Sequence, residues 1–150
     1  MQLVLDLFYV PQMALRRALL ATTAVATGFF LFVLYRFDPA TTELFPVCPF
    51  RYFTGYYCPG CGSLRALHQL LHGNVAAALS YNPLAVLTVP VILYWGASQA
   101  ALLWSGRPLR SRFVPARWIW SLLVLILSFW IFRNVSAPPF SLLAPGAALR

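Results

Sequence analysis

The stretch that decides the fold lies in the second half of the chain, where residues 83–104 read PLAVLTVPVILYWGASQAALLW without a single charge. A helix of this length rises about 33 Å, enough to cross a bilayer core of about 30 Å. Asn82 followed by Pro83 is typical of a helix N-cap with proline at the first helical position. The stretch therefore predicts a membrane-spanning helix that begins at Pro83.

Two further apolar runs flank this one. Residues 18–35, ALLATTAVATGFFLFVLY, follow a pair of arginines and carry no charge. Residues 118–132, WIWSLLVLILSFWIF, form a shorter run, but Arg117 and Arg133 at its ends can snorkel toward water, which extends the span to 117–133. The sequence thus predicts an all-α, polytopic membrane protein with three transmembrane helices in a single membrane domain, residues 1–150.

The composition agrees with a membrane environment. The chain is 61% hydrophobic and 9% charged, whereas a soluble domain carries about 25% charged residues. The net charge of +8 comes from arginines that bracket the apolar runs, which is typical of topology signals. No basic patch alternates with aromatic residues as single-stranded nucleic-acid binding requires. We therefore expect a lipid bilayer as partner and no nucleic acid.

Arginines also predict the orientation. Four of them crowd the short loop between the second and third spans: Arg107, Arg110, Arg112 and Arg117. Loops rich in arginine stay on the cytoplasmic side. The loop between the first two spans, residues 36–82, is then extracytoplasmic.

This long loop is predicted to carry one or two short interfacial helices. Ser63 and Gly73 are good caps for a helix over residues 64–72, and Asn74 can cap a second one over residues 75–81. On the first helix four leucines share one face, which predicts a helix lying on the membrane with its leucines toward lipid. The opposite, polar face would be wet and holds Arg65, His68, Gln69 and His72. Beyond the third span, residues 134–150 are rich in proline and alanine and predict an irregular tail.

Every cysteine and both histidines of the chain fall within residues 48–73. The turn Cys58-Pro59-Gly60-Cys61-Gly62 resembles the knuckle of zinc-ribbon proteins, because a tight turn points two sulfur atoms at one ion. Zinc takes four ligands, usually thiolate or imidazole. Cys48 would be the third ligand and His68 the fourth, with His72 as a substitute; zinc is the cofactor that this interpretation implies, while the sequence leaves the cofactor open.

Two other interpretations of the same residues stay open. Cys61 precedes a helix N-terminus, which would lower the pKa of its thiol and favour disulfide exchange with Cys58, with Cys48 as the resolving thiol. The turn could also be inert, with its cysteines acting as small buried residues and the histidines as part of a solvated helix face.

Residues 48–84 resemble domain-of-unknown-function family 2752, a group of small bacterial membrane proteins. The resemblance implies a multi-pass protein of the bacterial plasma membrane and favours a defined role for the three cysteines and Arg65. It supplies no activity and does not choose between metal and disulfide. The matching positions are Cys48, Pro49, Thr54, Gly55, Cys58 to Gly62, Arg65, His72, Gly73 and Asn82 to Leu84.

From these observations we expect a non-enzymatic subunit or accessory protein of a membrane complex, with its Cys-rich loop stabilised by zinc or a disulfide. Small residues spaced four apart on the first two spans, such as Ala24 and Gly28, predict packing against other membrane subunits or a second copy. The alternative is an enzyme, a membrane thiol-disulfide oxidoreductase using Cys58 and Cys61.

Overall fold

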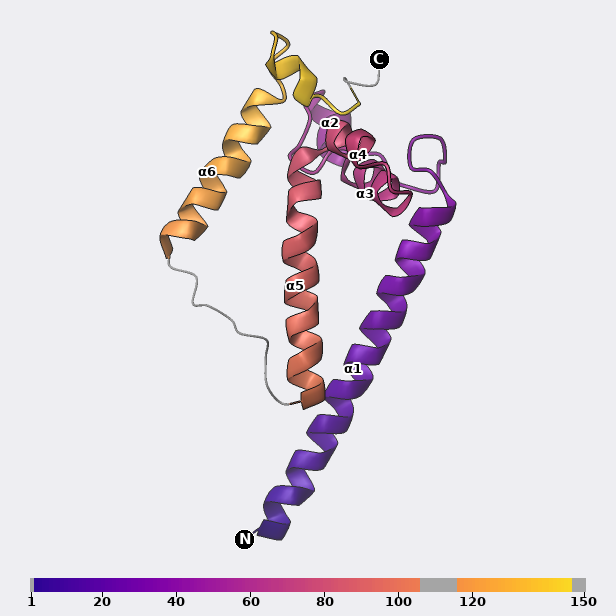
Figure 1. Cartoon of the computed structure of the whole chain (residues 1–150), viewed down its shortest axis with the longest axis vertical. Coiled ribbons are helices and arrows are strands. Elements are labelled where there is room, and N and C mark those ends of the chain that lie inside the picture. The colour runs from indigo at the N-terminus through magenta and orange to yellow at the C-terminus, as the bar shows by residue number, and fades with distance from the viewer. Residues whose placement is uncertain (1, 106–115, 147–150) are drawn as a thin grey trace. The chain divides into compact units, whose positions relative to one another are not determined.

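The computed structural model describes residues 2–105 and 116–146, with side chains over residues 14–104 and 117–146 (Figure 1). These described residues contain helices and no strand, which confirms the predicted all-α class. The elements are α1 (Gln2–Arg36), α2 (Pro49–Thr54), α3 (Ser63–Leu71), α4 (Val75–Tyr81), α5 (Pro83–Ser105), α6 (Ala116–Phe132) and the short 3-10 helix η1 (Phe140–Leu143).

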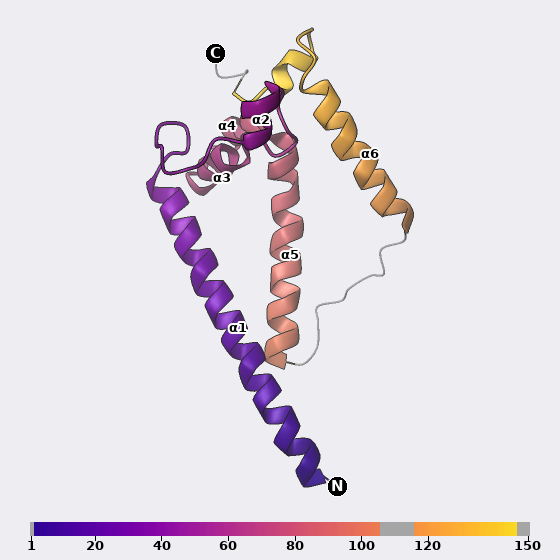
Figure 2. The same ribbon diagram turned by 180° about the vertical axis from the view of Figure 1, so that it is seen from behind.

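The chain divides into two compact units. The first comprises Met1–Phe32 and Pro90–Arg112, and the second comprises Val33–Val89 and Phe113–Arg150. In the second unit α2, α3 and α4 lie together at the N-terminal end of α5, as the front and back views agree (Figures 1 and 2). All three cysteines therefore belong to the second unit.

Two of the predicted spans are helices long and apolar enough to cross a membrane: Ala14–Arg36, of 23 residues, and Pro83–Trp104, of 22. Only 6% of each apolar window is buried inside the protein. A core helix of a soluble protein would instead be mostly buried. Large apolar side chains such as Leu93 and Trp95 point outward on α5, as lipid-facing residues do.

The third predicted span corresponds to α6, in which Arg117–Phe132 is apolar but shorter than the other two helices. A third crossing therefore stays a prediction. The loop arginines Arg107, Arg110 and Arg112 lie outside the described residues, so the predicted orientation also stays a prediction.

The start of α5 and the existence of α4 agree with the sequence. The Asn82 side chain accepts a hydrogen bond from the backbone N–H of Ala85 at 3.0 Å, which is the predicted N-cap. Helix α3 begins and ends one residue earlier than predicted. Gly62, with a φ of +82°, serves as its cap residue, because the Gly62 carbonyl already accepts the N–H of Ala66 at 2.8 Å.

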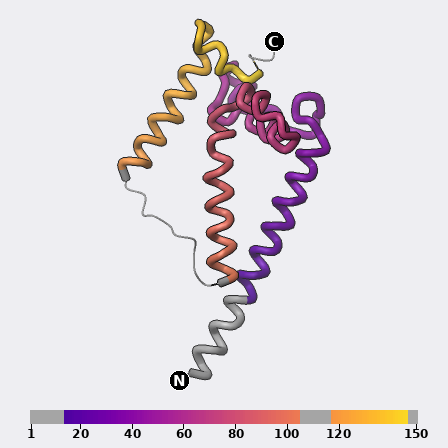
Figure 3. Tube along the Cα trace, viewed as in Figure 1, coloured from indigo at the N-terminus to yellow at the C-terminus, as the bar shows by residue number. Residues whose placement is uncertain are grey.

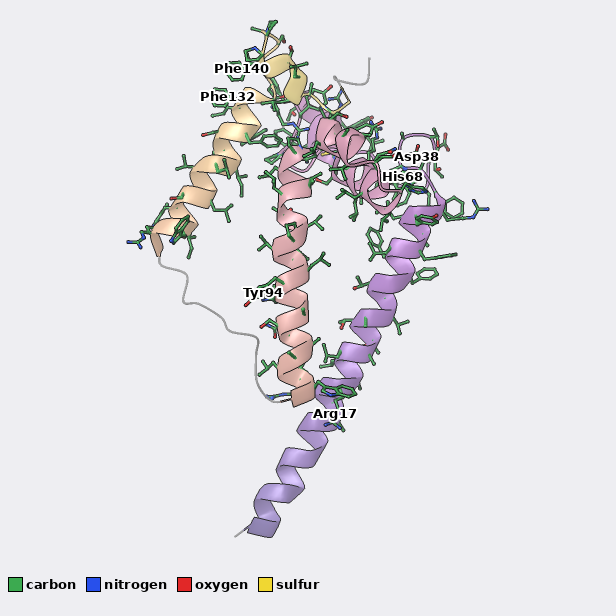
Figure 4. All side chains as sticks on the ribbon, viewed as in Figure 1. Arg17, Asp38, His68, Tyr94, Phe132 and Phe140 are labelled. Carbon is green, nitrogen blue, oxygen red and sulfur yellow. The ribbon has the colours of Figure 1, made fainter. Side chains whose placement is uncertain are left out.

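The segment predicted as an irregular tail contains η1 and folds back on the second unit. The ring of Phe140 stacks on that of Phe132 with centroids 4.7 Å apart (Figure 4). The N–H of Gly146 donates to the carbonyl of Ser80 at 3.0 Å, and the Cα trace turns back toward α4 (Figure 3). The tail thus covers the end of α4, beside the cysteine turn.

The second unit has a small core. Its buried apolar residues are Leu34 at the end of α1, Cys61, Ala66 on α3 and Ala78 on α4. Small side chains at the α3 and α4 positions let these two helices approach closely. Buried polar side chains complete the core, and two of them, Asn82 and Arg133, hold the cysteine turn in place.

Candidate metal centre

The turn that carries Cys58 and Cys61 is closed by its own backbone. The N–H of Cys61 donates to the carbonyl of Cys58 at 3.1 Å, and the N–H of Ser63 donates to that of Gly60 at 3.0 Å. Gly62 then takes the left-handed conformation that glycine adopts at no steric cost. A Cβ at Gly62 would lie 2.7 Å from the carbonyl oxygen of Tyr81, so no larger residue fits between the turn and α4.

The turn brings three sulfur atoms together. The Sγ of Cys58 lies 3.1 Å from that of Cys61 and 3.4 Å from that of Cys48, the residue preceding α2. All three Sγ atoms lie within 4.8 Å of one another. Thiolates at about 2.3 Å from a common tetrahedral ion lie about 3.8 Å apart, and the two separations from Cys58 are within about 0.7 Å of that value. The predicted sulfur ligands are therefore gathered at one point.

Backbone N–H groups surround these sulfur atoms. The N–H of Cys58 donates to the Sγ of Cys61 at 3.3 Å. The N–H of Arg51 lowers the pKa of the Cys48 thiol, although partial burial opposes the shift. Such N–H donors stabilise the thiolate form, which is the form that binds metals.

The pKa of the Cys61 thiol is shifted in the direction opposite to the one that the sequence predicted. Burial raises the pKa of the Cys61 thiol to about 12, and the neighbouring Cys58 sulfur adds to the shift. The lowered pKa expected from the helix N-terminus is therefore wrong: the side chain is 6% exposed, and loss of hydration outweighs the helix dipole. Of Cys48 and Cys61, Cys48 is the one whose surroundings favour the thiolate.

Arg133, at the end of α6, holds the turn from the other side. Its Nη1 donates to the carbonyls of Cys58 and Pro59, both at 3.1 Å, and its Nη2 donates to that of Cys61 at 3.0 Å. The side chain is 1% exposed. The sequence interpretation of Arg133 as a residue that snorkels toward water is therefore wrong.

Two asparagines complete this support. Asn82 is fully buried, and its Nδ2 donates to the carbonyl of Pro59 at 2.9 Å and to the Ser63 hydroxyl at 3.0 Å. Asn134 pairs with the backbone of Tyr57: its Oδ1 accepts the Tyr57 N–H at 2.8 Å and its Nδ2 donates to the Tyr57 carbonyl at 2.9 Å. Sequence analysis used Asn82 only as a helix cap and missed Asn134.

The histidines stand apart from the sulfur cluster. The cluster of potential ligands that the described residues form contains Cys48, Cys58 and Cys61, and neither histidine. The Nδ1 of His68, on α3 (Figure 4), donates to the carbonyl of Leu34 at 2.6 Å. Because His68 is 9% exposed, the alternative that placed it on a wet helix face is also wrong.

His72 joins α3 to the end of α1 in another way. Its ring stacks on that of Tyr35 with centroids 4.4 Å apart and an angle of 3° between the planes. Its Nδ1 donates to the carbonyl of His68 at 2.9 Å. The two histidines therefore fasten α3 to the first apolar helix. Arg65, also predicted as a functional residue, is exposed on α3.

The three sulfur donors of the cluster suit a soft or borderline metal ion. Three thiolate sulfurs are ligands that zinc accepts, and zinc takes four ligands in all. Cys48, Cys58 and Cys61 would hold the ion, and the carbonyl clamp made by Arg133 and Asn82 would keep the turn in position. The geometry also permits a disulfide after a small movement, since an S–S bond is about 2.05 Å long and all three cysteines are free thiols here.

Comparison with known proteins bears on this site directly. The model of a family described as "protein of unknown function (DUF2752)" matches residues 48–96. No curated protein and no solved structure gives a significant match to the chain. The matched segment contains all three cysteines, Asn82 and the first part of α5, and so the resemblance predicted from the sequence is confirmed: over residues 48–96 this chain resembles the DUF2752 family of proteins of unknown function.

Proposed function

We propose that this protein is a small, non-enzymatic accessory subunit of a membrane complex, with a zinc ion bound by Cys48, Cys58 and Cys61. The observation that carries the proposal is the meeting of the three sulfur atoms within 4.8 Å. The hydrogen bonds that hold the cysteine turn supply a second argument. Asn82 ties the turn to the start of α5, and Arg133 ties it to the end of α6. The metal would lock these segments into a rigid cap on the membrane helices.

The residues around the sulfur cluster favour a structural role for the metal over a catalytic one. The only acidic residues of the chain are Asp6, Asp38 and Glu43, and neither Asp38 nor Glu43 belongs to the sulfur cluster. A hydrolytic metal site needs a base such as a carboxylate to activate its water. We therefore assign the metal a structural role, which is to stabilise the fold of the cysteine loop.

Metal analysis with thiol counting tests the proposal. The protein, purified in detergent without added reductant, should contain one zinc per chain, and its three thiols should resist alkylation until a chelator is added. Each of the Cys48→Ser, Cys58→Ser and Cys61→Ser variants should lose the zinc. Absence of metal together with one free thiol per chain would instead support a disulfide and overturn the zinc site.

One observation favours a second candidate, a membrane thiol-disulfide oxidoreductase. The Sγ of Cys58 lies within 3.4 Å of both other sulfurs, so Cys58 is placed to form a disulfide with either. In this case Cys48 would be the attacking thiol, because its pKa is lowered whereas that of Cys61 is raised. Exchange with an external dithiol such as dithiothreitol, lost in Cys48→Ser, would support this candidate.

The membrane part of the proposal has three crossings in the bacterial plasma membrane, with the cysteine loop extracytoplasmic. It rests on two helices long and apolar enough to span and on a third, shorter apolar helix. With three crossings the two chain termini would lie on opposite sides. Reporter fusions at each terminus test this, and termini on the same side would contradict the third crossing.

Partner subunits, or a second copy, would pack against the small-residue faces of the first two spans. In the described part of the chain a Cβ added at Gly28 or at Gly96 would meet no heavy atom within 4 Å, so this chain leaves room at both positions. Substituting leucine there should reduce association in the membrane, because close approach of helix backbones needs small residues. Crosslinking in native membranes, compared with Leu87→Ala on another part of α5, measures the effect.

A further inference from the structure

Among the residues whose side chains the structure describes, three supply ligands to the sulfur cluster. Cysteine, histidine, aspartate and glutamate are the usual zinc ligands. Neither histidine has a ring nitrogen within the cluster, and both donate from Nδ1 to backbone carbonyls elsewhere. Asp38 accepts the N–H of Ala40, and Glu43 is outside the cluster. Among residues whose side chains lie outside the described part, Asp6 is the only one of these four types.

The positive charge of Arg133 lies beside the sulfur cluster and bears on the ligands that the metal would take. Arg133 is buried, and its three hydrogen bonds all go to backbone carbonyls, which carry no formal charge. Its Nε is buried without a hydrogen-bond partner among the described residues. A buried cation without a counter-charge is costly, by several kcal/mol for each ion. The groups able to become anions that interact electrostatically with Arg133 are the thiols of Cys61 and Cys58, followed by the phenol of Tyr57.

The formal charges of the cluster and of Arg133 indicate which metal ion and which fourth ligand suit the site. Three thiolates, one divalent ion and one guanidinium sum to zero. A fourth thiolate or a carboxylate on the metal would leave one uncompensated negative charge, and so would a monovalent ion in place of the divalent one. Because Arg133 and Cys61 are buried and Cys48 and Cys58 are half-buried, the neutral combination has the lowest desolvation cost.

We propose that Cys48, Cys58 and Cys61 form a three-thiolate site for a divalent metal whose fourth position takes a neutral donor from outside the chain, such as water or an imidazole, and that Arg133 is the positioning residue that balances its charge. This inference rests on the metal site proposed above and names the ligand class of that site. On binding, the three thiols release three protons to solvent, and the divalent ion takes their place.

Cobalt-substituted protein tests the open position. The metal-free, reduced protein in detergent is loaded with Co²⁺, whose visible d–d bands report the ligand set. Added imidazole should displace water and shift these bands with a saturable dependence on its concentration. An unmoved spectrum would mean that the chain supplies all four ligands, and would overturn the inference.

Arg133 variants test the charge. Arg133→Gln keeps a donor group but not the charge, and should weaken Co²⁺ binding by about 10- to 100-fold. Arg133→Lys keeps the charge with fewer donors and should retain most of the affinity. Equal losses in the two variants would mean that Arg133 acts only through hydrogen bonds, which overturns its charge-balancing role. Arg117→Gln, exposed at the opposite end of α6, is the matched control.

The two proposals fail in different ways. If the reduced wild-type protein binds no Co²⁺ or Zn²⁺ at all, the metal site itself is wrong. If it binds one ion per chain and imidazole has no effect, the metal site stands and only the open neutral position is wrong. The imidazole titration uses the wild-type protein, so it remains decisive even if an Arg133 variant does not fold.

Discussion

Arg133 and Cys61 are hydrogen-bonded across 72 residues of sequence: the guanidinium Nη2 of Arg133 donates to the carbonyl oxygen of Cys61 at 3.0 Å. The bond joins the end of α6 to the turn that carries the sulfur cluster. It directs the carbonyls of the turn toward Arg133, while the N–H of Cys58 points to the sulfur of Cys61. The two faces of the turn thus have opposite functions, one for anchoring and one for the sulfur atoms.

Arg133→Ala should destabilise the protein strongly. The substitution removes the guanidinium hydrogen bonds to the carbonyls of Cys58, Pro59 and Cys61 and leaves the Cys61 N–H and the Asn82 Nδ2 as their remaining donors, at a cost of about 3 kcal/mol or more in the free energy of unfolding. Denaturant unfolding in detergent measures this. Arg117→Ala, at an exposed arginine in the first turn of α6, should change the free energy by less than about 0.5 kcal/mol. Similar effects of the two substitutions would contradict the buried clamp.

Asn82→Asp should also destabilise, although it changes only one group of the side chain. The Nδ2 donor becomes an oxygen that faces the carbonyls of Pro59 and Cys61 at 2.9 and 3.3 Å. Repulsion between these oxygens should cost about 3 kcal/mol, because the site is buried.

Asn74→Asp is the control for that substitution. Asn74 is exposed and donates to the side chain of Gln69, whose amide can turn to present its donor instead. We expect a change of less than about 0.5 kcal/mol. Thermal melting of both variants under identical detergent conditions compares them, and an equal loss of stability would argue against the bonds assigned to Asn82.

Alanine substitutions at two glycines distinguish the cost of backbone strain from the cost of steric clash. Gly62 and Gly73 have nearly the same positive φ, +82° and +77°, so alanine costs about 1 kcal/mol or more of conformational strain at either. At Gly62 the new Cβ also lies 2.7 Å from the Tyr81 carbonyl, whereas at Gly73 it meets nothing within 4 Å. Gly62→Ala should therefore be worse than Gly73→Ala by at least about 2 kcal/mol, measured as a difference in unfolding free energy.

The sequence predicted what depends on local pattern. Apolar runs without charge gave α5 and most of α1, because helix length and hydropathy are properties of one segment. The predicted cap residues Asn74 and Asn82 gave the bounds of α4 and the start of α5, although only the Asn82 side chain accepts a capping hydrogen bond. The cysteine spacing gave the meeting of Cys58 with Cys61, and Cys48 joined them because Pro49 starts α2 close to the turn.

What the sequence could not predict depends on contacts between distant segments. Arg133 looked like a residue that ends a span, since nothing nearby in sequence indicates its carbonyl partners in the cysteine turn. Its predicted place on the same side of the membrane as the cysteine loop was the one available signal. His68 likewise lies where helix spacing puts a polar residue, and only the packing of Leu34 against α3 explains why it is buried.

His68→Phe should leave the metal content unchanged, because the histidine binds the Leu34 carbonyl and lies outside the sulfur cluster. The variant should still weaken the attachment of α3 to α1, through the lost hydrogen bond to a buried carbonyl, by about 1–3 kcal/mol. Zinc analysis with Cys48→Ser as the metal-deficient reference checks this. Loss of zinc in His68→Phe would restore His68 as the fourth ligand and remove the need for an outside donor.

The final prediction concerns the order in which the thiols react in metal-free, reduced protein. Cys48 should be alkylated by iodoacetamide before Cys61, because the Arg51 N–H lowers the pKa of the Cys48 thiol. Cys61 should react last, because it is buried and its pKa is raised to about 12. Between pH 7 and pH 9 Cys61 stays below its pKa, so its thiolate fraction and its alkylation rate should rise about tenfold for each pH unit.

Mass spectrometry of peptides after short alkylation pulses measures this order, and denatured protein is the control in which the three rates should converge. Rapid alkylation of Cys61 in the native protein would mean that the cysteine turn opens readily. The clamp made by Arg133 would then be too weak to hold a preformed site, and metal binding would have to fold the loop rather than fill it.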